Sequence, residues 1–115
     1  MSLRRREQLV RLARKYDALV ICDDVYDFLQ WPSDPDSTQS TVQRAFAPRL
    51  VDIDRFIDGG AEREGADGFG NVCSNGSFSK IAAPGLRTGW VEGTKKFAYG
   101  VSQTYVTSGR SYYLC

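Results

Sequence analysis

Six side chains in two short segments of the sequence carry groups that can do chemistry together. They are a carboxylate and a phenol three residues apart and, further along, two hydroxyls, an amine and a guanidinium: Asp23, Tyr26, Ser77, Ser79, Lys80 and Arg87. Hydroxyls beside an arginine make a phosphate site, because the guanidinium offers a bidentate fork and each hydroxyl donates a hydrogen bond. A lysine near fixed positive charge can have a lowered pKa and act as an amine nucleophile.

A carboxylate, a phenol, a phosphate cradle and a nucleophilic amine suit one kind of ligand, a phosphorylated aldehyde with a basic ring nitrogen. Pyridoxal phosphate has that shape. Taken singly, each residue has a structural interpretation as well, since an aspartate at a strand end is commonly a turn residue and a loop lysine is commonly solvated. The set as a whole, and no single member of it, therefore carries the prediction of a pyridoxal phosphate site.

The spacing Ser77-x-x-Lys80 also matches a second chemistry, the SxxK motif of penicillin-binding proteins and β-lactamases, in which the serine is acylated. That motif requires a helix through both residues together with SDN and KTG elements. The chain contains neither element, and Pro84-Gly85 follows the lysine too soon for a helix. A serine acyl hydrolase is therefore the remote alternative.

Residue counts exclude several other classes of function. The absence of histidine removes Ser-His and Cys-His dyads and most zinc sites, and no metal site is predicted. Three widely spaced cysteines without a CxxC pair indicate a reducing compartment, so we expect a cytoplasmic protein. Fifteen basic residues against fourteen acidic ones give a net charge of +1, which predicts no nucleic-acid partner. No apolar stretch approaches the ~18 residues that span a bilayer, so no membrane partner is predicted.

The elements that must position these groups can be read from periodicity. With 115 residues, 42% hydrophobic and 25% charged, the chain has the size and composition of one globular domain. Apolar residues at positions 9, 12, 13 and 16 predict an amphipathic helix, for which Ser2 is the candidate cap. The unbroken apolar run 18–22, ended by Asp23, predicts a strand buried on both faces, as in a parallel sheet. Ligands bind beyond the carboxyl ends of such strands, where Tyr26 also falls.

The second half of the chain is less regular. Residues 32–71, rich in Pro, Ser, Asp and Gly, are too long for an ordinary connection and predict a variable insertion or flexible loop, with a short strand at 50–56. Short strands are predicted around 72–74 and 87–92, and the loop between them carries the lysine. Thr94 is predicted to cap a helix that continues to Tyr99. The last residues, 104–115, show no clear period and are treated as a divergent tail.

In these two segments the sequence resembles the class I/II aminotransferases, pyridoxal-phosphate-dependent enzymes of fold type I. The resemblance rests on residues 18–26 (ALVICDDVY) and on residues 77–80 (SFSK) followed by 84–90 (PGLRTGW), and it runs from about Leu3 to Gln103. Within the family it is most similar to the branch of the 2-aminoadipate and kynurenine-type transaminases. It implies an α/β fold, namely the central part of the mixed, mostly parallel sheet of the family's large domain. It also implies amino-group transfer between an amino acid and a 2-oxo acid.

The resemblance assigns a role to each matching residue. It implies that Lys80 binds the cofactor covalently and then shuttles the proton between the substrate's Cα and the cofactor. Asp23, chosen over Asp24 by the family's D-x-x-Y spacing, would pair with the pyridine nitrogen, and Tyr26 would donate to the cofactor's phenolic oxygen. The residues implied to hold the phosphate are Ser77 and Arg87, with Ser79 as a further candidate.

Several parts of the family's site have no match in this chain. These are the glycine-led phosphate helix, the aromatic residue that stacks on the ring, the asparagine of the NPTG motif and the arginine that binds the substrate carboxylate. We therefore expect residues 1–115 to be a partial cofactor-binding large domain of a truncated chain, inactive when isolated, with a non-catalytic aminotransferase-like fragment as the alternative. A complete family member is expected to be a homodimer.

Overall fold

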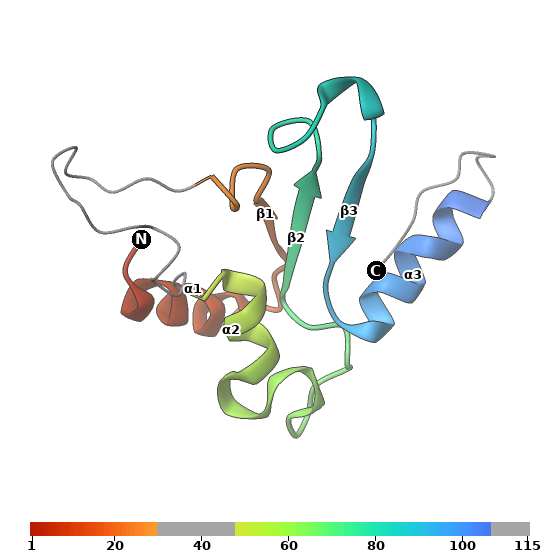
Figure 1. The fold of residues 1–115 in the computed structure, drawn as a ribbon. Helices are drawn as coiled ribbons and strands as arrows, with labels where there is room; N and C mark the ends of the chain where they lie inside the picture. Colours follow the sequence, from red (N-terminus) through yellow and green to blue (C-terminus); the bar gives the residue numbers. More distant parts are fainter. Residues whose placement is uncertain (30–47, 107–115) are drawn as a thin grey trace, which may run out of the picture.

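The described part of the chain, residues 1–29 and 48–106 of the computed structural model, is a mixed α/β arrangement around a small sheet (Figure 1). Its α-helices are α1 (Leu3–Lys15), α2 (Leu50–Phe56) and α3 (Lys95–Val106), its 3-10 helices are η2 (Ile57–Glu62) and η3 (Pro84–Leu86), and its strands are β1 (Val20–Asp23), β2 (Val72–Ser77) and β3 (Gly89–Glu92). Within these ranges no helix is both long enough and apolar enough to cross a bilayer.

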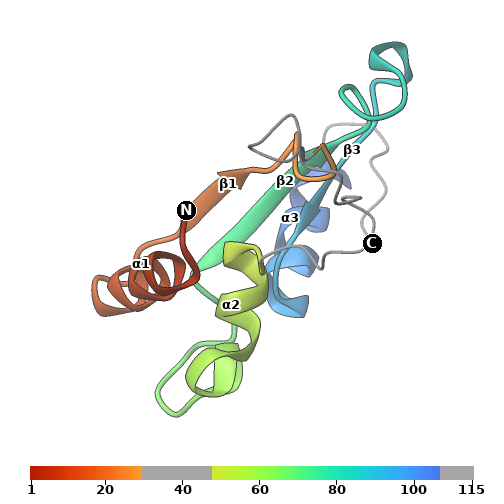
Figure 2. The same ribbon diagram turned by 60° about the vertical axis from the view of Figure 1, so that its left-hand side comes forward.

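The sheet has the strand order β1-β2-β3 and mixes two kinds of pairing. Strand β1 runs parallel to β2, with Asp23 opposite Asn75, while β3 runs antiparallel to β2, with Gly89 opposite Ser77. Helices α1 and α2 lie on one side of the sheet and α3 on the other, as the two ribbon views show (Figures 1 and 2). The α/β class with a partly parallel sheet is therefore confirmed in outline.

The core lies between β1, β2 and the two helices that share one face of the sheet. Its buried members are Val10, Val51, Ile53 and Val72. The predicted amphipathic helix is confirmed as α1, which buries Val10 and Ala13. Ser2 is its N-cap residue, but the serine hydroxyl makes no capping hydrogen bond.

The prediction of a strand buried on both faces is wrong for β1. Its side chains alternate between half-buried and exposed, and Ile21 is 70% exposed. The physical reason is that β1 has one strand neighbour among the described residues, and α1 and α2 cover only the face that carries Val20 and Cys22.

The predicted strand at 50–56 is also wrong, because these residues form helix α2. Leu50, Ile53 and Ile57 repeat at the i, i+3, i+7 spacing of a helix, and together with Val51 they pack into the core. The helix begins at a capping box in which the backbone N–H of Arg49 donates to Asp52 Oδ2 at 2.9 Å. Residues 30–47 lie outside the described ranges, so the insertion or loop over 32–71 stays a prediction.

The strands around 72–74 and 87–92 are confirmed as β2 and β3. The cap at Thr94 is confirmed as well, since its Oγ1 accepts a hydrogen bond from the Phe97 N–H at 3.1 Å. Helix α3 continues past Tyr99 to Val106, so the first residues of the expected tail 104–115 are helical. Residues 107–115 lie outside the described part of the chain.

Candidate functional site

The carboxyl ends of β1 and β2 bring Asp23 and Ser77 to the same face of the sheet. Asp23 pairs in register with Asn75, and side chains two apart on a strand share a face, so Ser77 lies on this face one step further along. The Asn75 amide donates a hydrogen bond to Asp23 Oδ1 at 3.3 Å. Sequence reasoning missed Asn75, and only the strand register could have revealed it.

The two adjacent aspartates occupy different surroundings. Asp24 accepts a hydrogen bond from the Ser74 hydroxyl at 2.5 Å, on the side of the sheet that α1 and α2 cover, and its backbone N–H donates to the carbonyl of Asn75. Asp23 is exposed. Of the two carboxylates, Asp23 is therefore the one that a ligand can reach.

Lys80 and Tyr26 meet above the end of the parallel strand pair. The Lys80 Nζ lies 5.5 Å from the centroid of the Tyr26 ring, and both side chains are exposed. Because β1 and β2 are parallel, the turn after one strand and the loop after the other emerge at the same end of the sheet. Residues 54 positions apart in the sequence thus become neighbours, as the predicted site requires.

The loop that carries Lys80 is tied to the ends of β2 and β3. The Phe78 N–H donates to the Thr88 carbonyl at 3.1 Å, and the Phe78 carbonyl accepts from the N–H groups of Ala82 and Ala83. The Ser77 hydroxyl oxygen accepts the N–H of Ser79 at 3.0 Å. Since that oxygen acts as an acceptor there, its own proton is available to an anion such as a phosphate.

Arg87 and Ser79 are the two predicted phosphate residues that the structure engages only locally. Arg87 is exposed, and its guanidinium donates to the Pro84 carbonyl of its own loop at 3.4 Å, a long and therefore weak bond. Ser79 is half-buried and contributes its backbone N–H to Ser77. No hydrogen bond joins the Ser77 side chain to the Arg87 guanidinium or to the Ser79 hydroxyl in this structure.

The helix needed for an SxxK site does not form. Ser77 is the last residue of β2, and Lys80 lies in the turn that follows it. The serine and lysine therefore do not face one another across a helical turn as that motif requires. The geometry disfavours the acyl hydrolase alternative.

A network of ion pairs around Arg49 holds the turn at residues 25–28, called the Tyr26 turn below, against α2 and β3. The guanidinium lies 3.5 Å from Asp27 Oδ2, in the Tyr26 turn, and 2.9 Å from Glu92 Oε2, on β3. Burial and the neighbouring Asp24 carboxylate raise the pKa of Asp27, while Arg49 opposes that shift. The pKa of Asp52 is lowered, because its hydrogen bonds from Arg49 outweigh the raising effect of burial.

A buried ion pair fixes the opposite end of β2, and sequence reasoning missed it as well. Asp54 is 2% exposed, and its Oδ1 accepts two hydrogen bonds from Arg14, from Nε at 3.1 Å and from Nη2 at 2.9 Å. Its Oδ2 accepts the N–H groups of Asn71 at 2.7 Å and Val72 at 3.1 Å. The pair thereby links α1, α2 and the start of the strand whose other end carries Ser77.

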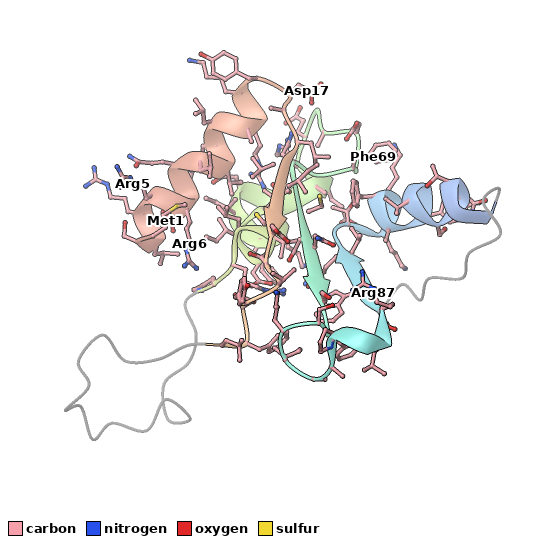
Figure 3. The ribbon with its side chains drawn as sticks, turned by 90° about the horizontal axis from the view of Figure 1, so that it is seen from above. Met1, Arg5, Arg6, Asp17, Phe69 and Arg87 are labelled. Atoms are coloured by element: carbon pink, nitrogen blue, oxygen red, sulfur yellow. The ribbon has the colours of Figure 1, made fainter. Side chains whose placement is uncertain are left out.

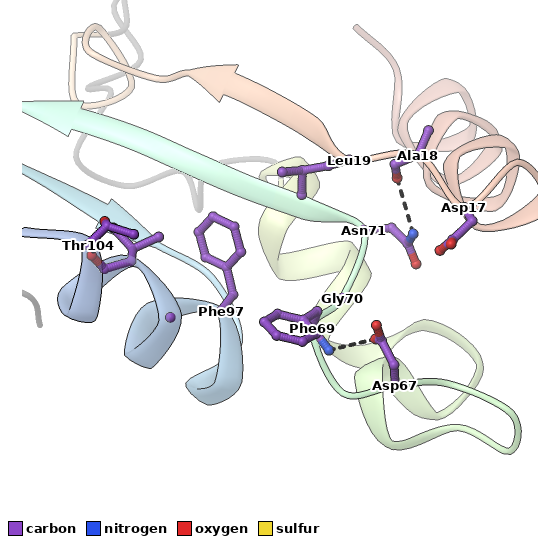
Figure 4. Close-up of a pocket in the computed structure, with 11 residues that line it drawn as sticks. Asp17, Ala18, Leu19, Asp67, Phe69, Gly70, Asn71, Phe97 and Thr104 are labelled. Atoms are coloured by element: carbon purple, nitrogen blue, oxygen red, sulfur yellow. Dashed lines mark hydrogen bonds between the residues drawn. The ribbon is translucent and has the colours of Figure 1, made fainter.

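A cavity of about 400 Å³ lies away from these groups. Figure 3 shows Arg87 at one end of the sheet and Asp17 and Phe69 at the other, and the cavity is at the Asp17 and Phe69 end (Figure 4). Its walls come from the residues before β1 and β2 and from α3, and none of the six predicted site residues lines it. The candidate site, at the carboxyl ends of β1 and β2, therefore lies outside this cavity.

Comparisons with known proteins relate the chain to aminotransferases. It is 33% identical over 105 residues to an aromatic amino acid aminotransferase of Schizosaccharomyces pombe. The aligned region covers 84% of this chain and 19% of that protein. It is 30% identical over 95 residues to the mitochondrial kynurenine/alpha-aminoadipate aminotransferase of Bos taurus (83% of this chain, 17% of that protein). It is 45% identical over 91 residues to an uncharacterized protein of Saccharomyces cerevisiae (79% of this chain, 18% of that protein).

The chain thus spans about a fifth of the length of the curated relatives that it matches. No protein-family model matches it. No solved structure matches it either.

Proposed function

Because the chain belongs to the aminotransferase family, of whose matched members it spans about a fifth, we propose that it supplies part of a pyridoxal phosphate site of fold type I. The reaction served by that site is amino-group transfer between an amino acid and a 2-oxo acid. The observation that carries the proposal is the approach of Lys80 Nζ to the Tyr26 ring, at 5.5 Å, in the turn that follows the exposed Asp23.

The donor set fits this cofactor group by group. The Lys80 amine suits an aldehyde, the Tyr26 phenol suits the phenolic oxygen, and the Asp23 carboxylate suits a protonated ring nitrogen. The available hydroxyl proton of Ser77 suits a phosphate oxygen. We assign the remaining phosphate contacts to Arg87 and Ser79, because the weak bond from Arg87 to Pro84 is easily exchanged for a charge-assisted one.

When bound, pyridoxal phosphate supplies an electron-accepting ring that stabilises negative charge at the substrate's Cα. The chain's own residues hold and move protons. The Asp23 carboxylate keeps a proton at the ring nitrogen, and Asn75 orients that carboxylate through its amide. The Lys80 amine would accept the proton that leaves the substrate's Cα, hold it as an ammonium group, and give the same proton back once the amino group has moved to the cofactor. Tyr26 donates its phenolic hydrogen and gives Lys80 an apolar face to lie on.

Covalent trapping of the cofactor tests the assignment. The 115-residue chain is incubated with pyridoxal phosphate, reduced with borohydride and digested, and the modified lysine is mapped among the four in the sequence. We expect the label at Lys80, with Lys80→Arg losing it. Label on Lys95 or Lys96 and none on Lys80 would contradict the proposal.

A chimera with a relative tests whether the residues of this chain can support catalysis. The chain replaces the segment that it matches in the Schizosaccharomyces pombe aromatic amino acid aminotransferase, and turnover is measured with aromatic and other amino acids and 2-oxoglutarate. We expect the chimera to be active and the polypeptide 1–115 alone to be inactive, because good positioning of reactants is worth ~7–11 kcal/mol of barrier and most of the family's site is absent from it. An inactive but folded chimera would favour the non-catalytic alternative.

A further inference from the structure

Trp90 on β3 contacts both segments that carry the proposed catalytic pair. Its ring meets Phe78 with a centroid distance of 5.1 Å and an interplanar angle of 62°, and it meets Phe28 at 6.4 Å and 63°. Phe78 opens the loop that carries Lys80, and Phe28 belongs to the turn that carries Tyr26. Edge-to-face aromatic contacts of this kind are worth ~0.5–1.5 kcal/mol beyond the area that they bury.

Gly76 provides the place in which the Trp90 ring lies. The two residues are register partners on β2 and β3, and a Cβ at Gly76 would stand 2.2–2.4 Å from the indole atoms. Only a residue without a side chain therefore lets the ring lie flat against β2, at the level where β2 ends and the Lys80 loop begins.

The two anchored segments are short. Phe78 is two residues from Lys80, and Phe28 is two residues from Tyr26. Hydrogen bonds within each segment, from Ala82 N–H to the Phe78 carbonyl at 3.0 Å and from Leu29 N–H to the Tyr26 carbonyl at 2.8 Å, transmit the position of each anchor to its neighbour.

We propose that Trp90 is a positioning residue: seated on Gly76, it joins the Tyr26 turn to the Lys80 loop and thereby sets the Lys80 amine against the Tyr26 ring. Its meaning for catalysis rests on the proposed cofactor site. The positioning itself does not, because it concerns two side chains of this chain and can be measured without the cofactor.

The cofactor-free measurement uses methyl groups on lysine. The four lysines are reductively methylated with ¹³C-formaldehyde, and the Lys80 resonance is assigned with Lys80→Arg. Since nuclei above an aromatic ring are shielded, we expect an upfield Lys80 signal that Tyr26→Leu abolishes. Trp90→Ala and Gly76→Ala should each move that signal toward the unshielded position, while Trp90→Phe keeps it.

Phe97→Ala is the matched control. It removes a half-buried aromatic ring that lies on α3 and lines the cavity at the far end of the sheet, so it lowers stability without touching either anchored segment. Thermal melts of every variant show which are folded at the temperature of measurement. We expect Phe97→Ala to retain the Lys80 shift. A Lys80 signal that stays at the wild-type position in folded Trp90→Ala and Gly76→Ala would overturn the proposal.

Cofactor trapping supplies the second readout. We expect the Lys80 label, relative to Lys95, to fall about tenfold or more in Trp90→Ala, since misplacing a reacting group by about 1 Å can cost about a hundredfold. Gly76→Ala alone should lower the Lys80 label by a similar factor. Added to Trp90→Ala, it should lower the label no further, because the added methyl group then has no ring to displace. Equal effects of Gly76→Ala in both backgrounds would contradict the role of Trp90. A wild-type chain that takes no label at Lys80 yet shows the Trp90-dependent methyl shift would refute the cofactor site alone.

Discussion

At the scale of single residues, function depends on which of two adjacent carboxylates faces the ligand. Asp23 and Asp24 are chemically identical, yet their surroundings differ. Asp23 is exposed and accepts a hydrogen bond from Asn75, whereas Asp24 accepts one from Ser74 on the face of the sheet that α1 and α2 cover. Alternation along a strand separates them, because successive side chains point to opposite faces. The assignment of Asp23 to the ring nitrogen therefore predicts that the two aspartates respond differently to the same substitution.

Asp23→Asn in the active chimera should lower turnover by more than about tenfold, since a neutral amide does not hold a proton on the ring nitrogen. Asp24→Asn is the matched control. It weakens one hydrogen bond to Ser74, worth ~1 kcal/mol of stability, and should leave turnover near the wild-type value. Steady-state kinetics and urea unfolding of both variants provide the measurements. An inactive Asp24→Asn with an active Asp23→Asn would place the site one residue along the chain.

At the scale of elements, two charged clusters hold the strand ends that carry the site. The Arg14–Asp54 pair secures the start of β2, and the Arg49 network secures the start of α2 and the Tyr26 turn. The two clusters differ in burial. The Arg14 and Asp54 side chains are 9% and 3% exposed, whereas Arg49 and its partners are about a quarter exposed. We therefore expect the first cluster to dominate stability and the second to respond to pH.

Asp54→Asn should lower the free energy of unfolding by ~3–5 kcal/mol, because it removes the nearer and buried counter-charge of the Arg14 guanidinium and leaves it only the Asp58 carboxylate at 3.8 Å. Asp58→Asn is the comparison: its carboxylate pairs with Arg11 where both side chains are about half exposed, and it reaches Arg14 only at 3.8 Å, so its loss should cost ~1 kcal/mol or less. Urea unfolding followed by circular dichroism compares the two. Equal small losses in both variants would show that the buried pair is not an anchor of β2.

The lowered pKa of Asp52 predicts a pH-dependent contribution to stability. A carboxyl group whose pKa is lower in the folded state than its ordinary 3.8 stabilises the fold above that value, and the effect is lost as the pH falls through the folded-state pKa. Asp52→Asn should thus destabilise the chain at pH 7 and match the wild type at the acid end. Asp27→Asn, at a group whose pKa is raised, should have the opposite sign at pH 7. Thermal melts at a series of pH values check both, and a loss at pH 7 that persists unchanged into acid would contradict the assignment to Asp52.

At the scale of the whole molecule, the described sheet has two outer strands and an incompletely covered face. Strands β1 and β3 each have one strand neighbour among the described residues. Large apolar side chains are exposed on β1 and just before it, with Ile21 at 70% and Leu19 at 47%. Open strand edges with apolar faces pair readily with other chains.

We therefore expect the polypeptide 1–115 to self-associate in solution and Ile21→Lys to reduce that association. The added charge stands in the middle of an outer strand, where lysine commonly blocks edge pairing. Glu64→Lys adds a lysine at an exposed position outside the sheet and should leave association unchanged. Sedimentation velocity over a range of concentrations measures both variants. Identical association in the wild type and in Ile21→Lys would place the contact surface elsewhere.

The sequence by itself determined those features that neighbouring residues decide. Three such features are present in the structure: the apolar face of helix α1, the strand that ends at Asp23 and the helix cap at Thr94. Each depends on a few side chains close together in the sequence. The two segments with the candidate groups could also be recognised locally, because residue types and short spacings carry that signal.

Only the tertiary structure decided which separated residues meet. Whether 50–56 became a strand or α2 depended on packing against α1 and β2, since its apolar pattern fits either element. The contact of Asn75 with Asp23 requires the strand register, and the seat of Trp90 on Gly76 requires the antiparallel partner strand. These contacts join residues far apart in the chain, and their formation depends on the shape and burial of the whole sheet rather than on any local preference.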